Sequence, residues 1–555
     1  MAEGLRIFID GRAIDVPGGT TILQAARQLG LDIPSLCYRE GCDPENACML
    51  CLVKLSDSGR LVPACSTTVV DRMQIESETD DLRELRRTGL ELLLSDHLGD
   101  CAAPCQNTCP AHMDIPQMLR QISAGQLDEA IATIKRDIAL PAVLGRVCPE
   151  VCERACRRAA IDDPAAICQL KRYVADADLS SRDPYLPPCK PSTGKRVAIV
   201  GSGPTGLAAA FQLLQEGHAC TLFEQQERAG GTLLAFCTRG ELPEEVLAGE
   251  IGIIERMGAV IQRSTAVGRQ ISLDKLRQQY DAVLLAVGAL DETTCRSLLQ
   301  GDPPAAGTDD LARFFHKDRI QADSHTRQTS LPAVFAAGNA VRPNKLAIRS
   351  IAAGKEAAVA IDQFLRGVAI TGPHRTFSVH IGSMESDEVA EMMQGVSERE
   401  RVEASHGAAD GLTDDQARQE ADRCLHCDCG KLDQCSLRRY ADALGANPNR
   451  YHGTSRDFSR QMQHGDVVYE PGKCILCGLC VQIAGKAQEP LGLTYIGRGF
   501  DVRIAAPFDR PIDEGLRQTA RACAEACPTG ALALRTECGY ATGCDRCAMQ
   551  CLEFA

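Results

Sequence analysis

The sequence lacks three features that would each assign it to a common class of protein. It contains no apolar run near the ~18 residues that a membrane-spanning helix needs, so we expect no membrane span. It has no excess of positive charge, because the formal net charge is −14, and we therefore expect no nucleic-acid partner. The first residues, MAEGLRIFIDGRAIDV, contain no apolar signal core, so we expect a cytoplasmic protein.

Cysteine, in contrast, is abundant, with 29 in 555 residues. In a reducing compartment, many cysteines at short spacings indicate metal ions or clusters instead of disulfides. Most of these cysteines fall into clumps, and a few stand alone among apolar residues, as buried structural cysteines do. The isolated ones are Cys189, Cys220, Cys237 and Cys295.

Residues 4–80 read as short strands around one helix, expected over 20–30, which begins at a threonine cap. After this helix come IPSLCY, ACMLCLV and LVPAC, which together can supply the four thiolates of a [2Fe–2S] cluster. A zinc ribbon is the alternative, although zinc sites usually pair two short C-x2-C units. The predicted ligands are Cys37, Cys48, Cys51 and Cys65, with Cys42 left out. The segment resembles the N-terminal domain of the large iron–sulfur subunit of respiratory complex I and of related NAD-linked hydrogenases and formate dehydrogenases.

Residues 81–180 are rich in Leu, Ala and Arg and read as helices that carry two cysteine runs, CAAPCQNTCPAHMDIP and GRVCPEVCERAC. These runs resemble the helical iron–sulfur domain of the glutamate synthase small subunit and of dihydropyrimidine dehydrogenase. That family interleaves two [4Fe–4S] clusters across the two segments. The resemblance implies that Cys105 and Cys148 belong to one cluster, and that Cys109, Cys152 and Cys156 belong to the other.

Two departures from this family complete the expected ligand sets. His97-x3-Cys101 replaces the leading C-x2-C and is similar to the complex I subunit, where a histidine ligates a cluster beside three cysteines. We therefore add His97 and Cys101 to Cys105 and Cys148, with a surface histidine as the alternative. Lys171 aligns with the family's Gln-type ligand, and an ammonium cannot coordinate iron. Cys168 is thus predicted as the fourth ligand beside Cys109, Cys152 and Cys156.

The segment KRVAIVGSGPTGLAAAFQLLQEGHACTLFEQQERAGG (195–231) has the strand–turn–helix–strand pattern of a dinucleotide-binding fold. Glycines permit the close approach of pyrophosphate to the helix N-terminus, and an acid about twenty residues on suits a ribose hydroxyl. With DAVLLAVGA and LPAVFAAGNAVRPNKLAIRS, the segment resembles glutamate-synthase-type flavoproteins, which implies FAD. A site retained without bound flavin is the alternative. The predicted FAD-binding residues are Gly201, Gly203, Gly206, Glu224, Gly230, Gly231, Gly288, Gly338 and Asn339.

The second dinucleotide domain of that family, which binds NAD(P)H, is missing. Only 43 positions separate Gly288 from Leu331, and one βαβ unit alone takes ~30 residues. No second G-x-G-x-x-G occurs between them. We therefore expect the flavin to exchange electrons with clusters, and a nicotinamide site to lie on another chain.

Three further cysteine groups follow. Residues 424–435 place four cysteines within twelve residues, which suggests one [4Fe–4S] cluster or a zinc site: Cys424, Cys427, Cys429 and Cys435. GKCILCGLC and ACAEACPTGAL resemble the halves of a bacterial two-cluster ferredoxin, of which only one site keeps its ligands: Cys474, Cys477, Cys480 and Cys527. Cys523 is orphaned, and LTYIGRGFDVRIAAPF resembles the matching stretch of the formate dehydrogenase catalytic subunit. The last group is predicted as a [4Fe–4S] site, with zinc or a partner interface as alternatives: Cys538, Cys544, Cys547 and Cys551.

Together these patterns predict a multidomain α/β protein. Its expected parts are a β-grasp 2Fe-2S ferredoxin-like domain (1–80), a helical domain with two 4Fe-4S clusters (81–188), a Rossmann-like FAD domain lacking the NAD(P)H subdomain (189–370), a linker with a 4Fe-4S motif (371–465) and a ferredoxin-like 4Fe-4S domain (466–555). The expected cofactors are one 2Fe-2S cluster, four or five 4Fe-4S clusters and FAD.

The functional hypothesis is an electron-transfer subunit of an NAD-linked multisubunit oxidoreductase of the hydrogenase, formate dehydrogenase or ferredoxin:NAD(P) type. Relay of electrons and flavin-based bifurcation both remain open. Expected partners are an FMN- and NADH-binding iron–sulfur subunit, a terminal reductase or hydrogenase module, and ferredoxin. The alternatives are a glutamate synthase small-subunit-like NAD(P)H-dependent enzyme and a zinc-binding scaffold without redox chemistry. No catalytic acid, base or nucleophile is expected.

Overall fold

The chain forms two compact units, each built from segments that are not contiguous in the sequence. The computed structural model describes residues 4–291, 293, 298, 314–316, 318–374, 376–402, 411–451, 453 and 458–534. Unit 1 consists of Met1–Ala103, Thr376–Val396 and Leu425–Ala555, and unit 2 of Pro104–Arg375 and Ser397–Cys424. The expected boundary at 80/81 therefore lies inside unit 1, and the one at 188/189 inside unit 2. Within the described ranges, no helix combines the length and hydropathy needed to cross a bilayer.

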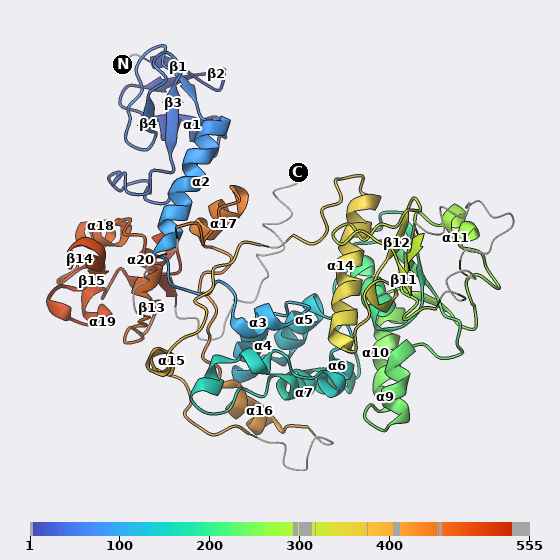
Figure 1. The fold of residues 1–555 in the computed structure, drawn as a ribbon. Helices are drawn as coiled ribbons and strands as arrows, with labels where there is room; N and C mark the ends of the chain where they lie inside the picture. Colours follow the sequence, from blue (N-terminus) through green and yellow to red (C-terminus); the bar gives the residue numbers. More distant parts are fainter. Residues whose placement is uncertain are drawn as a thin grey trace. The chain divides into compact units, whose positions relative to one another are not determined.

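The N-terminal part of unit 1 is a five-stranded mixed sheet that packs against one helix (Figure 1). The strand order is β2-β1-β5-β3-β4, with β1 parallel to β5 and the other pairs antiparallel. Its elements are β1 (Gly4–Ile9), β2 (Arg12–Pro17), α1 (Ile22–Gln28), β3 (Leu52–Leu55), β4 (Leu61–Pro63) and β5 (Gln74–Glu76). Helix α1 begins at a capping box in which Thr21 and Gln24 exchange hydrogen bonds, as the predicted threonine cap requires. Ile22, Ala25 and Ala26 are buried in the core.

The rest of unit 1 follows the long helix α2 (Asp80–Ser95), continues through short segments and ends in two small antiparallel ribbons. Strand β13 pairs with β16, and β14 pairs with β15. The elements are α15 (Ser386–Met392), α17 (Ser436–Ala443), β13 (Val467–Tyr469), η5 (Pro471–Lys473), α18 (Leu479–Lys486), β14 (Thr494–Ile496), η6 (Gly499–Asp501), β15 (Arg503–Ala505), η7 (Pro507–Asp509), α19 (Ile512–Gly515), α20 (Ala520–Ala526) and β16 (Leu532–Leu534).

Unit 2 begins with a group of helices and continues into a parallel sheet (Figure 1). The helical group contains α3 (Pro104–Thr108), α4 (Ile115–Ser123), α5 (Leu127–Asp137), α6 (Pro141–Val147), η1 (Glu153–Ala155), η2 (Arg157–Ala160) and α7 (Ile167–Leu179), and α16 (Asp414–Ala421) returns to it. Glu250 of the sheet region accepts the backbone N–H groups of Ala142 and Val143, both at 3.0 Å, and so joins the two parts of unit 2.

The sheet of unit 2 has the strand order β12-β9-β6-β7-β8, and all four pairings are parallel. Its elements are β6 (Arg196–Val200), α8 (Pro204–Gln215), β7 (Ala219–Phe223), η3 (Gly231–Leu233), α9 (Leu234–Thr238), α10 (Glu244–Arg256), β8 (Val260–Gln262), α11 (Leu273–Gln279), β9 (Ala282–Leu285), the hairpin β10 (Phe315–His316) and β11 (Arg319–Ile320), β12 (Val334–Ala336), η4 (Gly338–Ala340) and α14 (Ala347–Leu365). Gly354 of α14 packs so closely on α8 that a Cβ would lie 2.2 Å from the Thr205 carbonyl oxygen. This strand order, with the crossover helices, is the doubly wound arrangement that the glycine motif predicts.

One buried arginine ties α2 to the N-terminal sheet. The Arg86 side chain is 1% exposed and donates to the carbonyl oxygens of Leu50, Leu52 and Ser77 at 3.1, 2.9 and 2.8 Å. Leu50 and Leu52 lie on either side of Cys51 at the end of the cysteine loop, and Ser77 directly follows β5. Arg86 therefore ties the end of that loop to α2 and to the strand end.

Arg86→Met is expected to destabilise this sheet by about 2–4 kcal/mol, because three buried carbonyl groups lose their donor. Hydrogen exchange of the β3 and β5 amides would then become at least about 30-fold faster. Arg83→Met removes an exposed arginine of the same helix and is the control, with an expected effect within about 0.5 kcal/mol. Equal exchange rates in the two variants would contradict the role of Arg86.

Candidate functional site

Four thiols of the N-terminal domain lie together in the loop before β3 and at the end of β4. Cys37 Sγ is 3.4 Å from Cys48 Sγ, and Cys51 and Cys65 are hydrogen-bonded to each other. All four are buried. The structure thus brings together the predicted set of Cys37, Cys48, Cys51 and Cys65, while Cys42 is half-buried outside it.

Backbone N–H groups surround these sulfur atoms. The pKa of the Cys48 thiol is lowered to about 6, mainly by the hydrogen bond from Cys37 and also by the N–H groups of Leu50 and Leu36, whereas burial raises it. Hydrogen bonds to thiolate are among the means by which a protein sets the potential of an iron–sulfur cluster. The site therefore fits a cluster held by four thiolates.

A second thiol group in unit 1 combines residues from distant parts of the chain. The backbone N–H of Cys429 donates to the Cys101 carbonyl oxygen at 3.1 Å. Cys101, Cys429 and Cys435 are all buried, and burial followed by the charges of Cys429 and Cys101 raises the pKa of Cys435 to about 12. A Cβ on Gly530 would lie 2.2 Å from Cys429 Sγ, so only glycine fits there.

His97 belongs to the same region. Its imidazole Nδ1 is buried without a hydrogen-bond partner. Burial, and then the nearby Lys473 ammonium, lowers the pKa of His97 to about 4, so the ring is neutral. Lys473 also lies beside the Cys429 thiol. A neutral imidazole with one free buried nitrogen is the form that ligates metal.

This grouping differs from the expected one. Cys101 lies in unit 1 with Cys429 and Cys435, whereas Cys105 and Cys148 belong to unit 2. The four cysteines of residues 424–435 are likewise divided, because Cys424 closes unit 2 and the other three lie in unit 1. The physical reason is the return of the chain to unit 1 after a long excursion, which spacing along the sequence does not reveal. The density of cysteines at 424–435 predicted a single cluster or zinc site there, and this stays a prediction.

The C-terminal part of unit 1 contains a small cavity lined by cysteine. All four predicted residues face it: Cys474, Cys477, Cys480 and Cys527. The remaining lining is almost entirely apolar, with Leu479, Ile504 and Leu532 among it. Four thiols from two runs around one apolar cavity fit a [4Fe–4S] cluster.

The position of the second ferredoxin cluster is filled by protein. Cys523 is fully buried, and its thiol lies 3.7 Å from the Cys480 carbonyl oxygen. Ala484 and Ala520, which stand where thiols would be expected, belong to the same apolar core, as do Ile504 and Leu516. Two of the three positions that lack a ferredoxin ligand thus carry alanine packed in this core, and the third, Arg517, is exposed.

In unit 2, four cysteines surround one lysine. Cys148 ends α6 and is hydrogen-bonded to Cys168 of α7, and this hydrogen bond is the main cause that lowers the pKa of Cys148 to about 6. Lys171 carries the charge that acts on both, and also on Cys109 and Cys152. The predicted partners Cys109, Cys152 and Cys168 thus lie near one another, with Cys148 beside them, and the ligand role of Cys156 stays a prediction.

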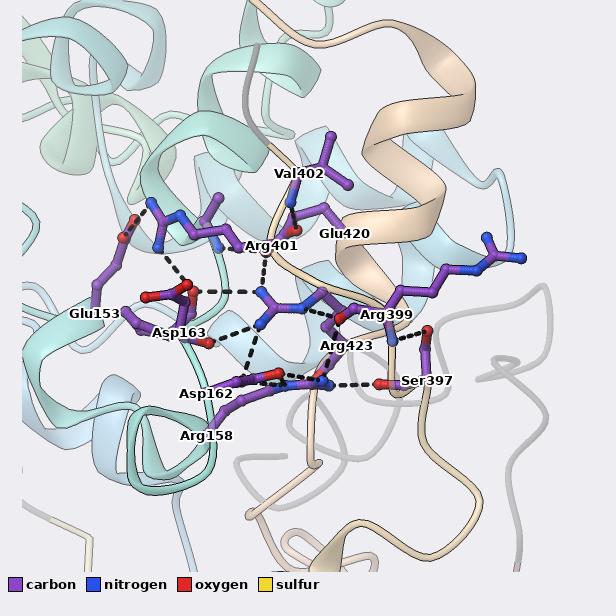
Figure 2. Close-up of polar contacts among 12 residues, drawn as sticks. Glu153, Arg158, Asp162, Asp163, Ser397, Arg399, Arg401, Val402, Glu420 and Arg423 are labelled. Carbon is purple, nitrogen blue, oxygen red and sulfur yellow. Dashed lines mark hydrogen bonds and ion pairs between the residues drawn. The ribbon is translucent and has the colours of Figure 1, made fainter.

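Two fully buried arginines hold the segments around the remaining thiols of unit 2 (Figure 2). Arg158 donates to the carbonyl oxygen of Arg423 at 2.8 Å, and both guanidinium groups bind Asp162. Arg158 lies two residues after Cys156, and Arg423 directly precedes Cys424. The network therefore fixes the backbones of these two cysteines relative to each other.

Glu420 and Glu153 extend this network (Figure 2). Glu420 binds Arg423 and accepts the N–H groups of Ala166 and Val402 at 2.8 and 2.7 Å. Glu153 accepts the N–H of Cys168 at 2.9 Å. Burial raises the pKa of Glu153, while this hydrogen bond and Arg401 lower it. The sequence did not predict this network, because its charged residues could equally belong to an ordinary solvent-exposed surface.

The turn after β6 has the geometry of a dinucleotide-binding loop. Gly201 has φ 104°, and a Cβ there would lie 2.5 Å from the Ala286 carbonyl oxygen. A Cβ on Gly206 would lie 2.0 Å from the Gly201 carbonyl oxygen, and one on Gly231 would lie 2.7 Å from the Cα of Gly203. These contacts require glycine and leave backbone N–H groups at the start of α8 open to an anion.

Two predicted polar residues at this fold are held in place by the protein. Glu224 ends β7 and accepts both the N–H and the hydroxyl of Ser202, at 3.1 and 2.6 Å. Asn339 bonds twice with the backbone and once with the side chain of Asn344, so it closes its own loop. The other Glu224 oxygen accepts the N–H of Gln226 at 2.8 Å, so the Glu224 carboxylate and the Asn339 amide are both bonded to the protein itself.

Some expected residues lie outside the described part of the chain, namely Cys295, Cys538, Cys544, Cys547 and Cys551. Among the residues that are described, no three His, Cys, Asp or Glu side chains are arranged to coordinate a single ion.

Three family models match parts of the chain. Residues 2–80 match a 2Fe-2S iron-sulfur cluster binding domain, residues 98–182 match dihydropyrimidine dehydrogenase domain II, 4Fe-4S cluster, and residues 161–363 match the pyridine nucleotide-disulphide oxidoreductase family. The chain is therefore a multidomain α/β protein that combines iron–sulfur domains with an oxidoreductase domain of flavoprotein type. These matches confirm the predicted 2Fe-2S domain, 4Fe-4S domain and Rossmann-like oxidoreductase domain.

Curated relatives share about a third of the chain. The NADP(+)-dependent formate dehydrogenase subunit beta of Moorella thermoacetica is 41% identical over 207 residues, which are 34% of this chain and 29% of that protein. The NADPH-Fe(3+) oxidoreductase subunit beta of Geobacter sulfurreducens is 42% identical over 190 residues, 34% of this chain and 28% of that protein. The small chain of glutamate synthase [NADPH] of Bacillus subtilis is 36% identical over 202 residues, 34% of this chain and 41% of that protein. The chain thus spans less than half the length of these relatives.

Gly201→Ala is expected to abolish flavin binding, because the added Cβ meets the Ala286 carbonyl and the backbone has positive φ. The flavin absorbance per chain should fall at least about tenfold. When the flavin site is not saturated, a loss of about 1.4 kcal/mol in binding free energy is enough for this decrease. Gly252→Ala, in α10 with open space around its Cβ, should keep its flavin. Full flavin content in Gly201→Ala would contradict the assignment.

Proposed function

We propose that this chain is an electron-transfer iron–sulfur flavoprotein subunit of an NAD-linked multisubunit oxidoreductase in the cytoplasm. The observation that carries the proposal is a single apolar core in unit 1. It contains cysteines of three separate thiol groups, together with leucines such as Leu50, Leu94 and Leu479: Cys37, Cys48, Cys101, Cys435 and Cys477. Electron transfer needs redox centres close together and shielded from water, and this core supports such an arrangement.

The proposed ligand sets in unit 1 follow the groups described above. They are Cys37, Cys48, Cys51 and Cys65 for [2Fe–2S]; His97, Cys101, Cys429 and Cys435 for one [4Fe–4S] cluster; and Cys474, Cys477, Cys480 and Cys527 for another. In unit 2 we propose Cys109, Cys148, Cys152 and Cys168 for one [4Fe–4S] cluster. Cys105, Cys156 and Cys424 are candidates for a further site, and Cys427 is left unassigned. Clusters supply one-electron steps, and FAD at the β6–α8 turn supplies a two-electron step.

The residues of the chain contribute binding, shielding and charge. The buried Lys473 pairs with Glu470 and lies beside Cys429, so it offsets thiolate charge at that site. The short separation of Gly288 and Leu331 supports a nicotinamide site on a partner chain. Partners would accordingly include an FMN- and NADH-binding iron–sulfur subunit, a terminal reductase or hydrogenase module, and ferredoxin.

Anaerobic purification with metal and flavin analysis tests this function. We expect one FAD and roughly 18 to 22 iron atoms per chain, for one [2Fe–2S] and four or five [4Fe–4S] clusters, with EPR signals on reduction. Stoichiometric zinc without EPR signals would establish a scaffold instead. Rapid bleaching of the flavin by NADH or NADPH alone would favour a self-sufficient enzyme of the glutamate synthase type.

Gly530→Ala tests the proposed site at Cys429. The added Cβ would overlap Cys429 Sγ, so about four iron atoms per chain should be lost with one [4Fe–4S] EPR signal. Gly485→Ala in α18 has open space around its Cβ and should keep both. An unchanged spectrum in Gly530→Ala would contradict the ligand role of Cys429.

A further inference from the structure

Lys171 is a buried ammonium among thiols. It lies on α7 one turn after Cys168, on the same side of the helix, and the two residues are 6% and 3% exposed. The thiols of Cys168, Cys148, Cys152 and Cys109 lie around its ammonium. A lysine side chain carries a positive charge and donates only, so it brings that charge into the site.

Backbone contacts fix the start of α7 against the thiols. Cys168 Sγ lies 3.6 and 3.7 Å from the carbonyl oxygens of Leu144 and Gly145, at the end of α6 that leads to Cys148. A Cβ on Gly145 would lie 2.6 Å from Cβ of Arg172, so the two helices touch. These contacts hold Cys168 and Lys171 at the site independently of any ligand.

A second buried lysine of the same helical group has its charge paired with oxygen atoms, as buried ammonium groups usually do. Lys135 is 1% exposed and pairs with Asp178 at 2.5 Å and with the Tyr185 carbonyl oxygen at 2.7 Å. Lys171 is instead surrounded by thiols that could ligate iron. An ammonium has no lone pair to offer a metal, so its contribution there is its charge.

We propose that Cys168 supplies the fourth thiolate of the site with Cys109, Cys148 and Cys152, and that Lys171 is a fixed counter-charge which raises the reduction potential of the cluster held there. The inference deepens the proposed function and rests on it. Each thiolate adds negative charge and opposes uptake of an electron, whereas a positive charge in a medium of low dielectric favours it. Lys171 would thus offset the charge that Cys168 adds.

The test is a mediated redox titration of the full chain, purified anaerobically and followed by EPR. In Lys171→Met we expect unchanged iron content and one [4Fe–4S] midpoint moved to lower potential. The expected shift is at least tenfold in the reduction equilibrium, about 59 mV for one electron, with the other signals unmoved. Lys171→Gln removes the same charge with a polar side chain and should give the same shift if the Met variant folds poorly.

The matched control is Lys135→Met/Asp178→Asn, which removes a buried ammonium together with its carboxylate partner in the same helical group. No midpoint should move in this variant. Cys168→Ala should lose one [4Fe–4S] signal or convert it to a three-iron signal. Unmoved midpoints in both Lys171 variants with full iron would overturn the role of Lys171, and an unchanged spectrum in Cys168→Ala would overturn its ligand role. Absence of iron from the unmodified chain would instead refute the proposed function.

Discussion

Unit 1 depends on closing a long excursion of the chain. The hydrogen bond from the Cys429 N–H to the Cys101 carbonyl joins residues separated by the whole of unit 2 in sequence. Around this contact lie the unpartnered Nδ1 of His97 and the buried thiol of Cys435. Closing so long a loop costs conformational entropy, which the buried contacts on both sides of the junction must offset. The thiol group forms only where that closure is complete.

Buried charge accompanies the thiols in both units. Lys473 with Glu470 lies beside Cys429, and Lys171 lies beside Cys168. Ammonium groups are costly to bury unless negative charge compensates them. Thiolates are also costly to bury in an apolar site, and their charge is negative. An ammonium and a thiolate that lie side by side therefore offset each other's cost of burial. At Arg158 and Arg423, shared carboxylates and carbonyl oxygens take that role.

The units also show what happens to a site that loses its ligands. Around Cys523, the position expected for a second ferredoxin cluster is packed with alanine and branched apolar residues. The neighbouring cavity is lined by four cysteines. Close packing and cofactor binding are thus alternatives for the same space, and the side chains at a few positions decide between them.

The sequence by itself determined what depends on near neighbours. The capped helix at Thr21, the glycine turn at Gly201 and the cysteines spaced within one loop were all predictable, because a few residues fix each backbone locally. Tertiary structure alone decided which cysteine runs lie together: Cys101 lies with Cys429, and Cys148 lies with Cys168. The buried network of Arg158 and Arg423 was equally hidden. Such pairings depend on which segments, distant in sequence, pack together and bury their polar groups. Neither the spacing of residues nor their periodicity contains that information.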